Sequence, residues 1–247
     1  MTSAAIWRVA ALASMSKKAL HAALSGEKAG EWIGAAAELG IADAQVRLGR
    51  MLLEGEGVTR DPARAFEAFA RAAAQGHADG HNMLGRCHEN GWGTPVDYPR
   101  AAQHYRLAAE KGLDWAQYNL AHMLLSGVGV AQDRAEALSW YRAAADQGHV
   151  RAMSLVGRCH EEGWATPRDP ATALDWYRRS AEGGYFRGAF NYATLLAETG
   201  RKEEADMWFD RAIATAPEPT RGRMIALRGA CPRRKARSLR GSAHRPA

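Results

Sequence analysis

Four basic side chains recur at a fixed interval of 36 residues, at Arg50, Arg86, His122 and Arg158. Arginine is one of the residue types that dominate binding hot spots, so such a column predicts a site for an acidic or carboxylate-bearing peptide. The alternative is that each arginine pairs with an acid three or four residues further along an ordinary solvated helix face. The acids available for such pairs are Glu54, Glu89, Glu161 and Glu162.

Two cysteine–histidine pairs, Cys87–His88 and Cys159–His160, carry side chains that bind zinc. Neighbouring residues of a helix point about 100° apart, and the two pairs lie two structural repeats apart, which is roughly 20 Å. One tetrahedral zinc with bonds of about 2.0–2.3 Å is therefore out of reach of both pairs. Met51–Leu52 and Met123–Leu124 fill the same positions in other copies. We therefore predict packing positions, with no metal and no cofactor.

No arrangement of residues predicts catalysis. The chain contains no G-x-S-x-G, no H-E-x-x-H and no phosphate-binding glycine loop ahead of a Lys-Ser/Thr pair. Its Gly-x-Gly-Val segments do not follow strands, as a dinucleotide-binding fingerprint would. His77 and His149 lie at repeat junctions, where a structural histidine is the simpler interpretation. Four aspartates precede predicted helices and are better explained as helix caps than as catalytic acids. They are Asp61, Asp97, Asp133 and Asp169. We predict that the protein is not an enzyme.

The elements that position these residues repeat with a period of 36. An apolar segment of helical period from Trp115 to Leu125 runs into the loop Gly127–Val130, and Asp133 then opens a second amphipathic segment. Glycine tolerates the left-handed conformation at a helix end, and aspartate satisfies free N–H groups at a helix start. The glycine that closes the unit recurs at Gly40, Gly76, Gly112, Gly148 and Gly184. A constant period of this kind indicates stacked helix–turn–helix repeats.

This pattern resembles the Sel-like repeat (SLR) family, a relative of the tetratricopeptide repeats. The residues that carry the resemblance in one copy are Ala116, Leu120, Gly127, Gly129, Val130, Asp133, Ala137, Trp140, Tyr141, Ala144, Ala145 and Gly148. It covers about 29–216 and departs locally, for example at Ala121 and at Ala165, which replaces the second loop glycine. The resemblance implies an all-α fold, an α-solenoid wound as a right-handed superhelix. It also implies a role mostly in protein–protein interaction, and no single activity.

Three segments are predicted. Residues 1–40 form a capping helix and a degenerate repeat, and residues 217–247 form a basic, mostly disordered tail. Between them the solenoid spans 41–216, with repeats at 41–76, 77–112, 113–148 and 149–184 and a shortened repeat at 185–216. A short helix around Arg223–Arg228 is predicted to cap the solenoid with Met224, Ile225 and Leu227.

Solenoids of this kind bind ligands on the concave wall made by the first helices of the repeats. Alignment with the related tetratricopeptide pattern puts the basic column on that wall. The predicted partner-binding residues of the concave face are Arg50, Asn82, Arg86, Trp115, Tyr118, His122 and Arg158. Trp92 and Trp164, in equivalent loops, are either anchors over the core or exposed aromatics for a partner. We predict a monomeric scaffold or adaptor that binds a protein or peptide, with an acidic ligand as the specific form of the hypothesis.

The net charge of +6 originates in the C-terminal segment. Residues 217–247 hold nine basic side chains and one acid, which is +8, so the rest of the chain carries about −2. The alternative function is binding of nucleic acid or an acidic surface through this tail. The tail has no aromatic side chain to stack on bases, which disfavours nucleic acid.

Residues 1–24 share features with a signal peptide, but Arg8 interrupts the apolar run and Lys17–Lys18 follow it. A capping helix is therefore favoured over a targeting segment. Neither Cys87 nor Cys159 has a second cysteine in its own repeat, which favours a reducing cytoplasm. A periplasmic or secreted location follows if 1–24 act as a signal. No run approaches the ~20 apolar residues of a membrane span, so no membrane partner is predicted.

Overall fold

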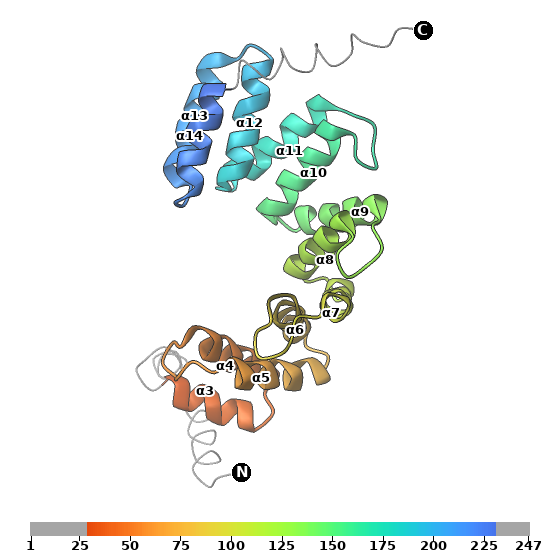
Figure 1. Ribbon diagram of the computed structural model, residues 1–247, viewed down its shortest axis with the longest axis vertical. Helices are drawn as coiled ribbons and strands as arrows, with labels where there is room; N and C mark the ends of the chain where they lie inside the picture. The colour runs from red at the N-terminus through yellow and green to blue at the C-terminus, as the bar shows by residue number, and fades with distance from the viewer. Residues whose placement is uncertain (1–28, 231–247) are drawn as a thin grey trace. The chain divides into compact units, whose positions relative to one another are not determined.

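The computed structural model describes residues 29–230, which form twelve helices and no strand (Figure 1). The helices are α3 (Ala29–Glu38), α4 (Ala42–Glu54), α5 (Pro62–Ala74), α6 (Ala78–Asn90), α7 (Tyr98–Glu110), α8 (Asp114–Ser126), α9 (Arg134–Asp146), α10 (Val150–Glu162), α11 (Pro170–Glu182), α12 (Phe186–Glu198), α13 (Lys202–Thr215) and α14 (Thr220–Ala230). The capping helix predicted within 1–24 and the end of the basic tail lie outside the described residues.

From α4 to α11 each 36-residue copy contributes one helix pair, so the predicted helix–turn–helix repeat is confirmed. The chain divides into two compact units, residues 1–140 and 141–247. In the first unit α4 packs against α5 and α6 against α7, and in the second α10 packs against α11 and α12 against α13. None of the helices in the described part is long and apolar enough to cross a bilayer.

The predicted caps define the helix ends. Gly55, Gly91, Gly127 and Gly163 end the first helices with φ of 75°, 72°, 70° and 74°. In this left-handed region a glycine N–H reaches a carbonyl of the last turn, as the N–H of Gly55 does at Met51. At the start of the second helices an aspartate accepts backbone hydrogen bonds, 3.0 Å long from the N–H of Arg64 to Asp61. Asp97, Asp133 and Asp169 do the same.

In the first, second and fourth repeats the core joins an aromatic side chain of the second helix to a glycine of the first. Phe69 and Tyr105 are fully buried in the first unit, as is Tyr177 in the second. A Cβ atom added to Gly85 would lie 2.6 Å from the Tyr105 ring. Glycine therefore stands where the two helices of a repeat approach closely.

The loops attach neighbouring repeats to one another. Gly93 and Gly129 adopt φ of 71° and 73°, and a Cβ on them would lie 2.1 Å from the carbonyl oxygen of Pro62 and 2.4 Å from that of Tyr98. The second loop glycine therefore lies directly on the first turn of the preceding repeat's second helix. Ala165, at the same position of the fourth copy, keeps a φ of 56°.

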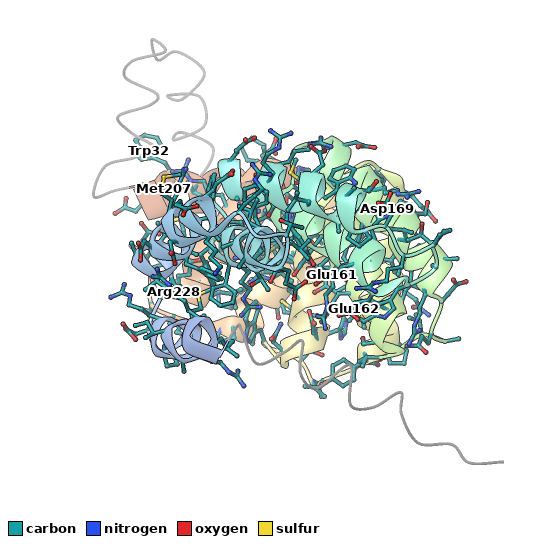
Figure 2. The ribbon with its side chains drawn as sticks, turned by 90° about the horizontal axis from the view of Figure 1, so that it is seen from above. Trp32, Glu161, Glu162, Asp169, Met207 and Arg228 are labelled. Carbon is teal, nitrogen blue, oxygen red and sulfur yellow. The ribbon has the colours of Figure 1, made fainter. Side chains whose placement is uncertain are left out.

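The end of the second unit corrects one prediction. The last helix is longer than the predicted 223–228, and it places only Met224 in the core, whereas Ile225 and Leu227 are 55% and 52% exposed. Arg228, marked in Figure 2, forms ion pairs with Asp206 and Asp210 of α13 at 2.7 and 2.5 Å. Met224 and the two ion pairs of Arg228 therefore join this helix to the rest of the unit.

Candidate functional site

Two residues of the predicted basic column meet in one cavity of the first unit. Arg50 extends from α4 and Arg86 from α6, and the cavity between them has a volume of about 410 Å³. Its walls are Arg50, Leu53, Glu54, Arg60, Met83, Arg86 and Trp92. Three guanidinium groups and one carboxylate give these walls a net positive charge.

Each arginine of the cavity has a defined contact. Arg86 lies over the Trp92 ring, 5.0 Å from its centroid, and Arg60 donates from Nε to the carbonyl of Leu53 at 3.0 Å. Arg50 pairs with Asp79 of the next repeat at 3.2 Å. These contacts leave terminal N–H groups of the guanidiniums available, because each guanidinium carries five donors.

Two of the four acids that the sequence offered as local partners hold tyrosines instead. Glu89 accepts a 2.5 Å hydrogen bond from the hydroxyl of Tyr105, and Glu161 one of 2.7 Å from Tyr177. Both acids therefore hold the buried tyrosine of their own repeat. Burial and the neighbouring carboxylate raise the pKa of each tyrosine far above its usual value, which keeps the hydroxyl a donor.

Sequence reasoning missed Arg60. The repeat could have revealed it, because Gln132 and Arg168 occupy the same position in the third and fourth copies. In all three copies this side chain donates to the backbone carbonyl seven residues earlier. Gln132 donates to Leu125 at 2.7 Å and Arg168 to Glu161 at 2.9 Å. A long polar donor at this position therefore fixes the end of the loop onto the first helix.

The second unit repeats part of this arrangement by itself. Arg158 of α10 lies 4.8 Å from the centroid of Trp164, as Arg86 does over Trp92. Trp92 is half-buried and packs against the core of the first unit. The anchor interpretation of Trp92 therefore holds, and its outer face receives an arginine.

The other predicted residues have different surroundings. Asn82 is 5% exposed and accepts a hydrogen bond of 3.2 Å from Asn119, so it joins α6 to α8. Trp115 is 46% exposed and meets Tyr118 edge-on at 6.4 Å, and His122 is exposed. Their role in binding stays a prediction.

The histidines and cysteines have structural surroundings. The Nδ1 atoms of His77 and His149 accept from the N–H groups of Gly80 and Ala152, so both rings cap helices, as predicted for junction positions. Burial raises the pKa of the Cys87 thiol to about 12 and that of Cys159 to about 11. Within 29–230 no group of three or more His, Cys, Asp or Glu side chains is arranged to hold a metal ion.

Solved structures with the same architecture include a Sel1 repeat protein from Oxalobacter formigenes, 30% identical, with a TM-score of 0.69 over 75% of this chain and 76% of that one. A protective antigen of uropathogenic Escherichia coli with an SLR fold is also 30% identical, with a TM-score of 0.68 over 75% of this chain. The match spans 41% of the antigen's length. An immunity protein from Pseudomonas aeruginosa, 18% identical with a TM-score of 0.50 over 70% of this chain and 66% of that one, shares the fold alone.

A comparison with curated proteins gave no match. The family profile of the Sel1 repeat matches four consecutive segments, 42–77, 78–113, 116–149 and 150–185. These segments make up more than half of the chain and follow the helix pairs from α4 to α11. The chain therefore belongs to the Sel1 repeat family.

Proposed function

We propose that this protein is a non-catalytic scaffold whose first unit binds an acidic segment of a partner protein in the cavity between α4 and α6. The observation that carries the proposal is the set of three arginines around one cavity beside Trp92. Arginine is always protonated in proteins, so these side chains suit carboxylate binding and not proton transfer. Sel1 repeats generally serve as protein-interaction scaffolds, which supports a binding role for the cavity.

The contacts of the arginines favour binding over simple solvation. Arg86 stacks on an indole ring and Arg60 is tethered through Nε, so both guanidiniums are oriented before a ligand arrives. Preorganised side chains lose less conformational entropy on binding than free ones. Leu53 and Met83 supply apolar surface next to the charges, as the centre of a protein interface requires.

The test compares full-length protein with the double variant Arg50→Ala, Arg86→Ala as bait in affinity purification with quantitative mass spectrometry. Truncation of a hot-spot arginine typically weakens binding by about 1–2 kcal/mol or more, so partners recovered by the native bait should be depleted at least several-fold. Arg178→Ala is the matched control, because Arg178 is an exposed arginine paired on its own helix with Asp175 and Glu182. Equal recovery by the double variant and the native bait, with both folded, would refute the proposed site.

The alternative of nucleic-acid binding through the C-terminal tail stays a prediction, because the end of the tail lies outside the described residues. A salt titration of full-length protein against a 1–216 truncation tests it. Each phosphate neutralised on duplex DNA adds roughly 0.9 to the slope of log K against log salt, so an equal slope for both chains would rule the tail out. The cytoplasmic location is likewise a proposal, supported by the buried, unpaired thiols of Cys87 and Cys159.

A further inference from the structure

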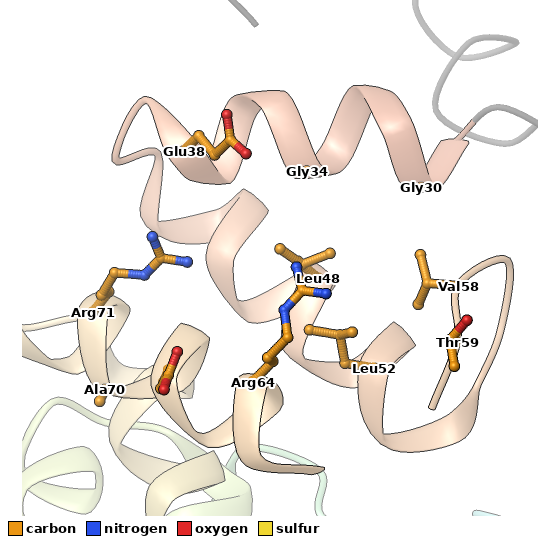
Figure 3. Close-up of a pocket in the computed structure, with 11 residues that line it drawn as sticks. Gly30, Gly34, Glu38, Leu48, Leu52, Val58, Thr59, Arg64, Ala70 and Arg71 are labelled. Atoms are coloured by element: carbon orange, nitrogen blue, oxygen red, sulfur yellow. The ribbon is translucent and has the colours of Figure 1, made fainter. Parts of the chain in front are cut away.

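A second, larger cleft opens in the first unit between α3 and α5, with a volume of about 760 Å³ (Figure 3). Leu48 and Leu52 of α4 form its floor, Gly30 and Gly34 its α3 wall, and Arg64 and Arg71 lie on the α5 side. This volume is within the range of about 300–1,000 Å³ that is typical of ligand sites. The cleft shares no lining residue with the arginine cavity between α4 and α6.

The α3 wall of the cleft is open at Gly34, whereas Gly30 is closely packed, because a Cβ atom added to Gly30 would lie 2.8 Å from Val58. Thirty-six residues further on, Gly30 and Gly34 correspond to Phe66 and Ala70. A Cβ atom added to Gly34 would meet no atom within 4 Å, so this part of the wall faces open space. The degenerate repeat therefore leaves a hollow beside α5.

Two arginines of α5 extend toward α3 across this hollow (Figure 3). Arg64 and Arg71 are seven residues apart, which places them on one face of the helix about 10.5 Å apart along its axis. Glu67 lies between them at the spacings that normally form helical ion pairs. Neither arginine has a carboxylate within 4 Å among residues 29–230.

Arginines at the equivalent positions of other copies do have partners. Arg100, which corresponds to Arg64, pairs with Asp97 at 3.3 Å. Arg179, which corresponds to Arg71, lies 4.1 Å from the centroid of the Trp176 ring. The copy beside the cleft is also the one of the four that carries arginine at both positions.

We propose that the α3–α5 cleft binds a short extended segment of a partner protein that carries acidic side chains three residues apart, with an apolar residue between them. An extended chain in the polyproline II conformation has three residues per turn and a rise of about 3.1 Å per residue. Residues i and i+3 therefore lie on one face about 9 Å apart, which matches the separation of Arg64 and Arg71. The apolar residue contacts the floor at Leu48 and Leu52. Glu38, at the Arg71 end of the cleft in Figure 3, disfavours a third acid there.

Fluorescence anisotropy of a labelled peptide with a Glu-Pro-Leu-Glu core, titrated with full-length protein, tests this site. Gly34→Leu places a side chain at a point where an added Cβ atom meets no atom within 4 Å, and it should weaken binding at least ten-fold, as should Arg64→Gln with Arg71→Gln. Gly34→Ala is the matched control, because a methyl group leaves most of the cleft open. A peptide with a Gln-Pro-Leu-Gln core should also bind at least ten-fold more weakly, and Arg86→Ala should leave binding unchanged, because Arg86 lies in the other cavity.

The outcomes separate this site from the arginine cavity between α4 and α6. Loss of binding in Arg86→Ala with retention in Gly34→Leu would overturn the cleft and assign the peptide to the other cavity. No measurable binding of the Glu peptide by native protein, or equal binding of the Glu and Gln peptides, would overturn the proposal outright. Thermal unfolding by circular dichroism confirms that Gly34→Leu remains folded, so loss of binding reports on the cleft.

Discussion

Acidification should destabilise the first unit through three stacked histidines. The Nδ1 atoms of His81 and His104 are 3.1 Å apart, and the His88 ring stacks on His104 with centroids 5.7 Å apart. Burial, followed by the neighbouring His81, His88 and Arg100, lowers the pKa of His104 from 6.5 to about 4. Burial also lowers the pKa of His81, with Lys111 as a smaller cause, and that of His88, where Arg100 adds to burial and Asp97 opposes it.

The direction in which stability changes with pH depends on whether the folded or the unfolded state binds more protons. Below pH 6.5 the unfolded chain protonates His104 while the folded protein does not, so the free energy of unfolding falls as pH falls from 6.5 to about 4, where the loss is complete. One pH unit of difference between the two pKa values corresponds to about 1.4 kcal/mol. His104 alone therefore removes about 3 kcal/mol at most, and its ring is partly exposed, so solvent screening reduces this figure.

The assay is urea unfolding followed by circular dichroism at pH 7.5 and pH 4.5, for native protein and for His104→Gln. Glutamine keeps a polar group opposite His81 but does not titrate in this range. The variant should lose less stability than native protein between the two pH values, by about 2 kcal/mol. An equal loss in both proteins would show that His104 titrates normally in the folded state, and the reasoning from burial would be wrong.

Two further predictions concern backbone and packing. Ala165→Gly should raise stability by about 0.5–1 kcal/mol, because alanine at a φ of 56° is strained and glycine is not; a lower melting temperature would contradict this. Gly85→Ala should destabilise by about 1–3 kcal/mol through its 2.6 Å approach to Tyr105. Gly34→Ala, in open space within a helix, should instead stabilise the protein by about 0.5–1 kcal/mol. If both substitutions shifted the melting temperature in the same direction, the packing argument would be refuted.

The repeat made most of the fold predictable. Local rules decide the helix ends, since Gly55 and Asp61 act through their own backbone and the turn next to it. Because the sequence pattern repeats every 36 residues, the helix boundaries assigned in one copy could be checked against those in the other copies. The last helix was harder, because no second copy of it exists in the chain. Which of Met224, Ile225 and Leu227 enters the core depends on how the helix turns against α13, and adjacent apolar residues do not decide that.

The candidate site was predictable in part. Arg50 and Arg86 reached one cavity because their 36-residue spacing places them at the same point of successive first helices. The pairing partners were not predictable, since Arg50 reaches Asp79 of the next repeat and Trp92 folds back under Arg86 from a loop. Spacing within one helix was the only information available for these side chains. Contacts between repeats and loops depend on tertiary packing.

In a repeat protein, equivalent positions of the copies can be compared with one another. The positions at which one copy differs from the others indicate where properties specific to this protein lie. A feature present in every copy, such as the aspartate cap, is explained by the repeat and needs no ligand. A feature that one copy alone shows must have a local cause. Glycine at position 34 and histidine at position 104 are such departures, since the corresponding residues 36 further on are Ala70 and Trp140. Gly34 lines a cleft beside two arginines, and His104 completes a stack of three histidines. Both departures give the first unit features that its repeat architecture alone does not explain.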